Sequence, residues 1–230
     1  MKSFNKLGGV ENILILSDYR QEDIEGLKVS FKHLNLKCFE IESSGIYNAM
    51  NFGLDKVKTQ YFMCINGGDR LFDSENLNKL LRNLDGKKWG YGSVSIVNPL
   101  TNSSRKYKFN HYSVLLHRFS LKYVPHPSVI MDTTFARGLS GFDENFKVSA
   151  DQKLIMQFGI DSKPFVSKDV ISEFYLGGES TRSQSEITSD FEEISNDLFK
   201  PVFSSRFIEK FLWNLIKKIR SFMGNYIRKV

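Results

Sequence analysis

Hydrophobic and polar positions follow two alternating spacings along the first half of the chain. Short apolar runs predict buried strands, and apolar residues three or four positions apart predict helices that cover a sheet. The predicted strands are 12–17, 36–41, 61–65 and 89–97. The predicted helices are 23–33, 45–57 and a leucine-rich helix after Asp73, a candidate N-cap. This order implies right-handed crossovers and a mostly parallel sheet flanked by helices, so we expect an α/β fold.

The pattern becomes irregular after Asn98. Polar residues predict a mobile loop at 98–110 and a flexible, serine-rich loop at 180–189. Pro125-His126-Pro127 constrains the backbone before the next apolar run. The remaining predicted elements are the apolar run 129–131, a helix at 146–158 and a strand at 170–176.

Two acidic residues directly follow predicted strands. Asp18 comes after the strand at 12–17, and Asp69 ends the turn Asn66-Gly67-Gly68-Asp69 after the strand at 61–65. Ligands of open α/β sheets bind beyond the carboxyl ends of the strands, and adjacent parallel strands would place both carboxylates on one rim. A carboxylate there suits a hard divalent cation that also binds phosphate oxygens. An ordinary turn with a solvated Asp is the alternative.

A second acidic region follows in the last third of the chain. Gly141-Phe142-Asp143-Glu144 precedes Ala150-Asp151, and Asp151 falls just inside a predicted helix. An Asp in the first helical turn is explained by the helix dipole. The functional alternative is a general base near the rim of the sheet.

Taken together and in order, these segments resemble the family-2 glycosyltransferases, which adopt the GT-A fold. Residues 45–54 resemble the G-I-Y-D-A-M-N-x-G-I segment of that family, and 61–69 resemble its strand ending in L-N-S-G-D, a variant of the D-x-D metal motif. His126, Arg137, 141–146 and 150–151 resemble H-Q…R…G-F-D-E-x-F…A-D, and 177–180 resemble G-G-x-S. Asp18 and Asp23 keep the offset of a D-G-G-S-x-D turn. The resemblance covers roughly residues 10–180.

The resemblance implies an inverting, metal-dependent transfer of a sugar from a nucleotide-diphosphate sugar to a cell-surface glycan or lipid-linked acceptor, as in bacterial polysaccharide or lipopolysaccharide synthesis. It implies that Asp69 holds Mg²⁺ or Mn²⁺ and that Asp151 is the catalytic base. The donor-binding residues it implies are Asp18, Asp23, Asn51, Asn66, Gly67, Gly68 and Asp69. The implied contacts with acceptor or phosphate are His126, Arg137, Asp143 and Glu144. For His126 and Arg137, a surface salt bridge or a structural hydrogen bond is the alternative.

The chain also departs from the family pattern. Members begin with a strand and a helix before the segment that matches 12–17, so we expect the usual first strand to be lacking here. Other family residues are replaced by Tyr19-Arg20-Gln21-Glu22, Ser43-Ser44, Asn48 and Pro127. These departures leave a second interpretation open, a non-catalytic GT-A-like partner subunit that has lost donor binding.

Charge is concentrated at the C-terminus. The 230 residues include 32 basic and 26 acidic ones, and residues 206–230 hold seven of the basic residues but only one acid, Glu209. The remainder is therefore neutral, with 25 residues of each sign, which disfavours nucleic-acid binding. From Phe207 onward apolar residues keep a helical spacing. A basic amphipathic helix is typical of an interfacial membrane anchor, although a helix packed on the body or on a partner subunit needs the same stripe.

Composition completes the prediction. With 41% apolar and 25% charged residues, the chain reads as a GT-A-like domain at 1–200 followed by a basic amphipathic helix at 201–230. The N-terminus lacks the apolar core of a signal peptide, and no apolar run reaches the roughly 20 residues of a membrane-spanning helix. Cys38 and Cys64 are expected to be buried thiols rather than a disulfide. We expect a cytoplasmic protein held peripherally at the inner face of the cell membrane, alone or with a protein partner or second copy.

Overall fold

The computed structural model describes residues 12–17, 25–26, 29, 36–42, 44–108, 111–177, 184–201 and 205–227. In these ranges the strands are β1 (Asn12–Ser17), β2 (Leu36–Ile41), β3 (Tyr61–Phe62), β4 (Arg70–Leu71), β5 (Trp89–Asn98), β6 (Ser103–Tyr107), β7 (Val129–Asp132) and β8 (Phe165–Tyr175). The helices are α2 (Ile46–Lys56), α3 (Ser74–Arg82), α4 (Val114–Arg118), the short 3-10 helix η2 (His126–Ser128), α5 (Thr133–Gly138), α6 (Ala150–Asp161), α8 (Gln184–Leu198) and α9 (Arg206–Ile227).

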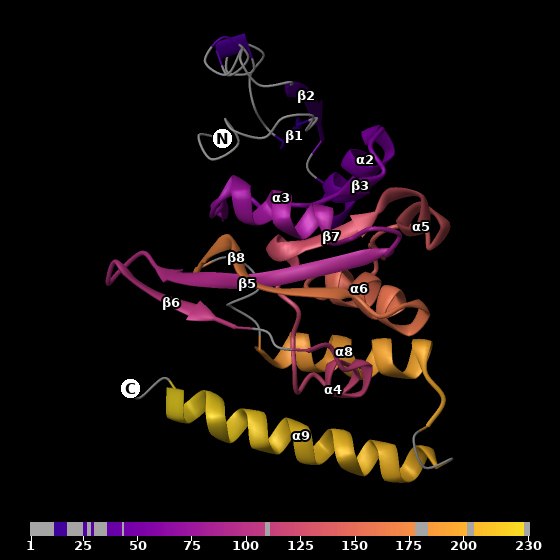
Figure 1. Ribbon diagram of the computed structural model, residues 1–230. Coiled ribbons are helices and arrows are strands. Elements are labelled where there is room, and N and C mark those ends of the chain that lie inside the picture. The colour runs from indigo at the N-terminus through magenta and orange to yellow at the C-terminus, as the bar shows by residue number, and fades with distance from the viewer. Residues whose placement is uncertain are drawn as a thin grey trace.

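A mixed sheet forms the centre of the molecule (Figure 1). Its strands lie in the order β3–β7–β5–β8–β4, and β6 pairs with β5 as a hairpin. The long central pair β5–β8 is parallel, whereas β3–β7, β7–β5, β4–β8 and β5–β6 are antiparallel. β1 and β2 form a separate parallel pair. The α/β class is therefore confirmed, but the mostly parallel sheet is wrong, because β4, β6 and β7 run opposite to the central pair.

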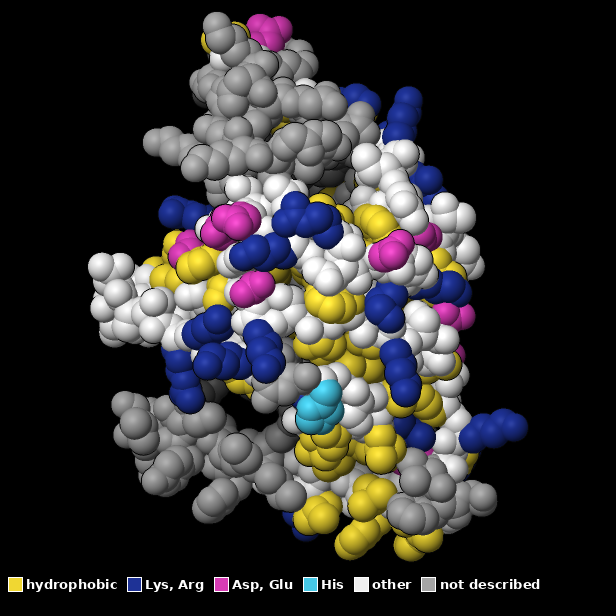
Figure 2. Space-filling model, in the orientation of Figure 1, with side chains coloured by type: hydrophobic (Ala, Val, Ile, Leu, Met, Phe, Trp, Pro, Cys, Tyr) yellow, Lys and Arg dark blue, Asp and Glu magenta, His cyan; other side chains and the backbone are white. Residues whose placement is uncertain are grey.

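Helices cover both faces of this sheet. Leu77, Leu80 and Leu84 of the α3 region pack on one face, and the buried residues of α6 pack on the other. α8 lies beyond α6, and α9 is the outermost layer on that side (Figure 1). Hydrophobic side chains gather at the end of the molecule formed by α4 and α9 (Figure 2). Among the described helices, none combines the length and apolar content needed to cross a bilayer.

The predicted strand at 61–65 is shorter than expected. Of residues 61–65, all of which are described, only Tyr61 and Phe62 pair with a neighbouring strand, which is β7. The side chains nevertheless alternate, because Tyr61, Met63 and Ile65 pack on the α3 side while Phe62 and Cys64 pack on the α6 side. The period-two pattern therefore indicated the burial of this segment correctly and its pairing only in part.

Two predicted loops are wrong. The segment 98–110 contains β6, the second strand of a β-hairpin, in which every residue is exposed and no apolar alternation marks the strand. The predicted loop at 180–189 contains the start of α8, whose buried residues Ile187, Phe191 and Ile194 have helical spacing among many polar neighbours. α6 begins at Ala150 rather than at 146.

Several other predictions are confirmed. β1 and β2 have the predicted bounds, and α2 and α3 lie where the apolar spacing placed them. The Asp73 carboxylate caps α3 by accepting a hydrogen bond from Glu75 N at 2.8 Å. Of the predicted helix 23–33, residues 25–26 and 29 are helical and the others lie outside the described residues. Cys38 and Cys64 are free thiols, as predicted, but they are partly rather than fully buried.

Candidate functional site

Asp69 lies in a turn between β3 and β4. The turn is closed by a 3.1 Å hydrogen bond from Asp69 N to Asn66 O, and Gly68 takes a φ of +100°, which favours glycine. Asp69 Oδ1 accepts a hydrogen bond of 3.0 Å from Tyr175 N at the end of β8. The carboxylate is therefore fixed to the last residue of a central strand, half-buried and behind two exposed glycines.

The environment of Asp69 fits a divalent cation that also has other ligands. Burial raises the pKa of Asp69 to about 6, against a smaller lowering by the Tyr175 hydrogen bond. Within the described part of the chain its second oxygen accepts no hydrogen bond, and no cluster of three or more His, Cys, Asp or Glu side chains could hold a metal alone. Mg²⁺ is commonly held by one or two carboxylates together with substrate phosphates. A site of this kind needs the phosphates of a ligand to be complete.

Asp151 lies in the first turn of α6, as predicted, and both of its oxygens accept hydrogen bonds. Tyr47 Oη of α2 donates to Oδ1 at 3.1 Å, and Gln152 Nε2 donates to Oδ2 at 2.8 Å. Tyr47 Oη also lies 2.5 Å from Val148 O, just before the helix. Burial, followed by the charge of Asp151, raises the pKa of Tyr47, so the phenol stays protonated and donates. The Asp151 carboxylate is thus oriented by two donors.

His126 and Cys64 lie near Asp151. Burial lowers the pKa of His126 and the Asp151 charge partly opposes this, so the imidazole is neutral at pH 7. Its ring packs edge-on against Phe142 at 5.6 Å, and His126 Nε2 is buried without a partner among the described residues. Burial, with a smaller contribution from Asp151, raises the pKa of the Cys64 thiol to about 12. Both shifts place these side chains within electrostatic reach of Asp151.

The segment that begins with β3 connects the surroundings of Asp151 to the turn of Asp69. Cys64 is close to Asp151, and Asp69 follows five residues later through a closed turn. Two extended residues and one turn span at most about 14 Å. The predicted metal ligand thus follows a segment whose Cys64 senses the charge of the predicted base, and Asp69 itself is held at the end of β8.

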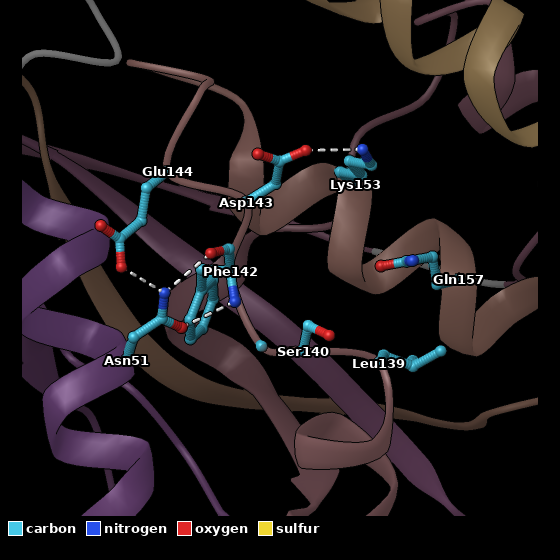
Figure 3. Close-up of a pocket in the computed structure, with 9 residues that line it drawn as sticks. Asn51, Leu139, Ser140, Phe142, Asp143, Glu144, Lys153 and Gln157 are labelled. Carbon is cyan, nitrogen blue, oxygen red and sulfur yellow. Dashed lines mark hydrogen bonds and ion pairs between the residues drawn. The ribbon is translucent and has the colours of Figure 1, made fainter.

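Asn51 holds a loop against α2 (Figure 3). Its side-chain amide accepts from Phe142 N and donates to Phe142 O, each at 2.8 Å, and also donates to Glu144 at 2.8 Å. Gly141 has a φ of +69°, and a Cβ there would come within 2.5 Å of Asn51 Oδ1. Asn51 was predicted to bind the donor, but here its polar atoms position the loop that leads to Asp151.

Asn51 and this loop line a cavity of about 320 Å³. The other lining residues include Asp143, Lys153 and Gln157. Lys153 Nζ pairs with Asp143 at 2.7 Å and with Asp197 of α8 at 2.6 Å, which ties the loop, α6 and α8 together. The cavity borders neither Asp69 nor Asp151. Asp143 pairs with Lys153 and Glu144 accepts from Asn51, so both predicted contact residues are engaged within the protein.

Arg137 caps α2. Its Nη2 donates to Leu54 O and Val57 O at 2.6 Å, and to Asp55 O at 3.2 Å, which satisfies carbonyls at the end of the helix. Of the two predicted roles, the structure favours the structural hydrogen bond over a phosphate contact.

Some predicted residues lie outside the described ranges, and some functional residues were missed. Asp18 and Asp23, and residues 178–180 of the G-G-x-S segment, are not described. Tyr47 and Gln152 were not predicted as site residues, although Tyr47 belongs to the G-I-Y segment and Gln152 adjoins Asp151. These two local features of the sequence could have marked Tyr47 and Gln152 as candidates, although neither shows that they contact Asp151.

The mixed sheet with helices on both faces matches the GT-A fold of solved glycosyltransferase structures. The uncharacterized glycosyltransferase MT1564 of Mycobacterium tuberculosis is 23% identical over 145 residues, which cover 58% of this chain and 52% of that protein. The chain thus spans about half the length of the curated relatives it matches. No protein-family profile matches the sequence.

Solved structures share the fold at low sequence identity. Residues 1–349 of Staphylococcus aureus TarS, in complex with UDP-GlcNAc, align with a TM-score of 0.63 and 16% identity over 84% of this chain and 58% of that one. The mannosyltransferase PcManGT of Pyrobaculum calidifontis, in complex with GDP-Man and Mn²⁺, aligns with a TM-score of 0.55 and 13% identity over 80% of this chain and 53% of that one. These likenesses show a common fold.

Proposed function

We propose that this chain transfers a sugar from a nucleotide-diphosphate sugar to a hydroxyl group of a glycan or lipid-linked acceptor, with inversion at the anomeric carbon. The observation that carries the proposal is the half-buried Asp69 carboxylate, which Tyr175 N fixes at the end of β8 and whose second oxygen accepts no hydrogen bond among the described residues, in a fold shared with sugar transferases. TarS was solved with UDP-GlcNAc and PcManGT with GDP-Man and Mn²⁺, which supports a nucleotide-sugar donor.

Donor binding is assigned to the turn that carries Asp69. The exposed glycines Gly67 and Gly68 leave open space where a diphosphate can approach the backbone, and Asp69 would hold Mg²⁺ or Mn²⁺ against it. The cation, when bound, supplies Lewis-acid stabilisation of the charge on the leaving diphosphate. The hydrogen bond from Tyr175 N holds the Asp69 carboxylate at the end of β8.

Asp151 is assigned the role of general base. It would take the proton of the acceptor hydroxyl as that oxygen attacks the anomeric carbon and the bond to the diphosphate breaks. Tyr47 and Gln152 hold the carboxylate in place without touching the substrate, so they are positioning residues. His126, whose buried Nε2 has no hydrogen-bond partner among the described residues, is assigned to a contact with acceptor or phosphate that would require this atom to become accessible.

Calorimetry with a panel of UDP- and GDP-sugars in the presence of Mn²⁺ tests the donor site. We expect Mn²⁺-dependent binding of at least one donor, its loss in Asp69→Asn, and its retention in the control Asp85→Asn, a change at an exposed turn residue. Asp151→Asn should bind the donor normally and lose about 10²–10⁴-fold in turnover, measured as release of the nucleoside diphosphate.

The same titrations separate the two interpretations. If the wild-type chain binds no nucleotide sugar, the catalytic proposal fails and the non-catalytic partner subunit is favoured. If a donor binds but Asp69→Asn binds it equally well, the assignment of the cation site to Asp69 is wrong.

A further inference from the structure

Helix α9 packs on the body through one of its faces. Trp213 is 1% exposed, and the centroid of its ring lies 5.5 Å from that of Phe119. Glu209 is buried in an ion pair with Arg118. Arg118 also donates to Ser195 at 2.8 Å, which joins α4, α8 and α9. This face therefore has its partner in the protein itself.

A second apolar face of α9 has no partner in the described chain. Phe207 is 82% exposed and Phe211 64% exposed, and Ile208 and Leu215 are exposed as well. We call these four residues the apolar strip. Phe207, Phe211 and Leu215 are four positions apart and so lie on one side of a helix with 3.6 residues per turn. Two large aromatic side chains in water favour a partner that removes them from it.

Positive charge accompanies the apolar strip. Arg206 and Lys210 each precede a strip phenylalanine by one position, and Lys218 comes seven positions after Phe211, on the same side of the helix. All three are exposed, and we call them the basic row. The only acidic residue of α9, Glu209, is neutralised by Arg118 inside the protein. The exposed surface of this part of α9 is therefore apolar and cationic, with no acidic group.

These features point to one kind of occupant. A second copy docked by two-fold symmetry would place the basic rows of two helices against each other, which like-charge repulsion disfavours. A planar anionic surface suits a straight helix of 22 residues, about 33 Å long, on the outer side of the molecule (Figure 1). Leu115 and Leu121 are exposed in and beside α4, which packs on α9. Hydrophobic side chains gather at this end of the molecule (Figure 2).

We propose that the apolar strip and the basic row form an interfacial binding surface for anionic lipid bilayers, with α9 lying in the plane of the membrane. Each basic residue close to an anionic surface strengthens binding about fivefold, and each buried aromatic ring about tenfold or more. The proposal is independent of the catalytic site, because neither Asp69 nor Asp151 belongs to α9.

Vesicle co-sedimentation of the full chain tests it. The probes are vesicles of phosphatidylcholine alone and of phosphatidylcholine mixed with phosphatidylglycerol. We expect binding to the anionic vesicles, at least about tenfold weaker binding to the neutral ones, and a loss of about a hundredfold in the double variant Phe207→Gln, Phe211→Gln. The double variant Lys210→Gln, Lys218→Gln should weaken binding to the anionic vesicles by about 25-fold and leave binding to the neutral vesicles unchanged.

The matched control is Leu100→Gln, a similar change at a side chain that is 94% exposed on the β5–β6 turn, which should bind as the wild type does. Thermal unfolding of the strip variant should match that of the wild type, because the changed side chains are exposed. The proposal is overturned if the wild-type chain ignores anionic vesicles or if the strip variant binds them equally. It is also overturned if sedimentation velocity shows a dimer that the strip variant dissolves.

Discussion

Hydrogen bonds around Asp151 continue into the interior as a chain of side chains. Gln152 donates its amide to Asp151 and to Val124 O, so its Oε1 is left to accept from His117 Nε2 at 2.9 Å. His117 Nδ1 in turn accepts from Tyr112 Oη at 3.2 Å. This arrangement requires a neutral imidazole with its proton on Nε2. Burial, partly opposed by the Gln152 bond, lowers the pKa of His117 to about 4, in agreement with that state.

His117 should make the fold sensitive to acid. Its pKa is about 4 when folded and about 6.5 when unfolded, so only the unfolded chain takes up the proton between these values. The free energy of unfolding should therefore fall as the pH is lowered from about 6.5 to about 4, by up to about 3 kcal/mol from this residue. Urea denaturation across this pH range measures the slope.

The control for this prediction uses the other kind of histidine environment. His117→Gln should flatten the slope, whereas His111→Gln, at an exposed position, should leave it unchanged. An unaltered slope in His117→Gln would show that other groups cause the acid sensitivity.

Tyr47 should act on catalysis through Asp151. Tyr47→Phe keeps the ring, whose centroid lies 6.0 Å from that of Phe142, and removes only the hydroxyl with its hydrogen bonds to Asp151 and Val148 O. A hydrogen bond to a charged group is worth about 1.5–3 kcal/mol, so turnover should fall by about tenfold or more while donor affinity stays constant. Kinetics and calorimetry on the same variant make the comparison. Equal losses in both would indicate a structural role alone.

At this scale the sequence gives the ends of the network but not its middle. The turn glycines before Asp69 and the helical position of Asp151 are local features, and both could be predicted. Tyr47 is 104 positions from Asp151, and His117 is 35 from Gln152. Only the fold brings such pairs together, so a single sequence holds no local signal for their contacts.

At the scale of elements, the conformation of the loop between α5 and α6 depends on the absence of a side chain at Gly141. Gly141 has a φ of +69° and faces Asn51 Oδ1, which is bonded to the backbone of Phe142. A side chain at Gly141 would both strain the backbone and displace that bond. Because the loop leads directly to Asp151, its position matters for the base.

Gly141→Ala should therefore destabilise the protein by about 1–3 kcal/mol, measured by urea denaturation. Gly138→Ala is the matched control, three residues earlier at the end of α5, where a Cβ meets nothing within 4 Å and φ is not positive. Equal stability of the two variants would refute the proposed dependence of this loop on the absence of a side chain at Gly141.

Elements with strong apolar periodicity were predicted well, and polar ones were not. α2 and α3 each bury one stripe on the sheet, and their positions followed from it. β6 is exposed on every residue, so its pairing with β5 leaves no hydrophobic signature. The mixed direction of the sheet also escaped prediction, because strand order and direction depend on long-range pairing.

For the molecule as a whole, the attachment of α9 rests on a buried charge pair. Glu209→Ala would leave the Arg118 guanidinium buried without its carboxylate, and breaking one side of a buried pair costs about 3–5 kcal/mol. We expect a loss of that order in the free energy of unfolding, measured by chemical denaturation. Lys217→Gln breaks a more exposed contact with Glu192 and should cost less than about 1 kcal/mol. Similar losses in both variants would show that the Arg118–Glu209 pair does not carry the attachment.

The C-terminal stripe illustrates what remains hidden at this scale. The sequence predicts a helix and a basic, apolar composition, and the helix is confirmed. The apolar positions nevertheless belong to two faces, one docked through Trp213 and one exposed through Phe207. The periodicity is the same for both, so only the packing of α9 on α4 and α8 separates them.

The stacking of α6, α8 and α9 has a geometric consequence. Asp151 lies in the first turn of the innermost of these helices (Figure 1), and adjacent packed helices are about 8–10 Å apart, so the start of α6 stands about 16–20 Å from the axis of α9. A molecule resting on its outer helix would work at a constant altitude over the lipid headgroups. Substrates whose reactive hydroxyl sits flush with the headgroups would be out of reach, and those raised on a spacer of that height would be selected.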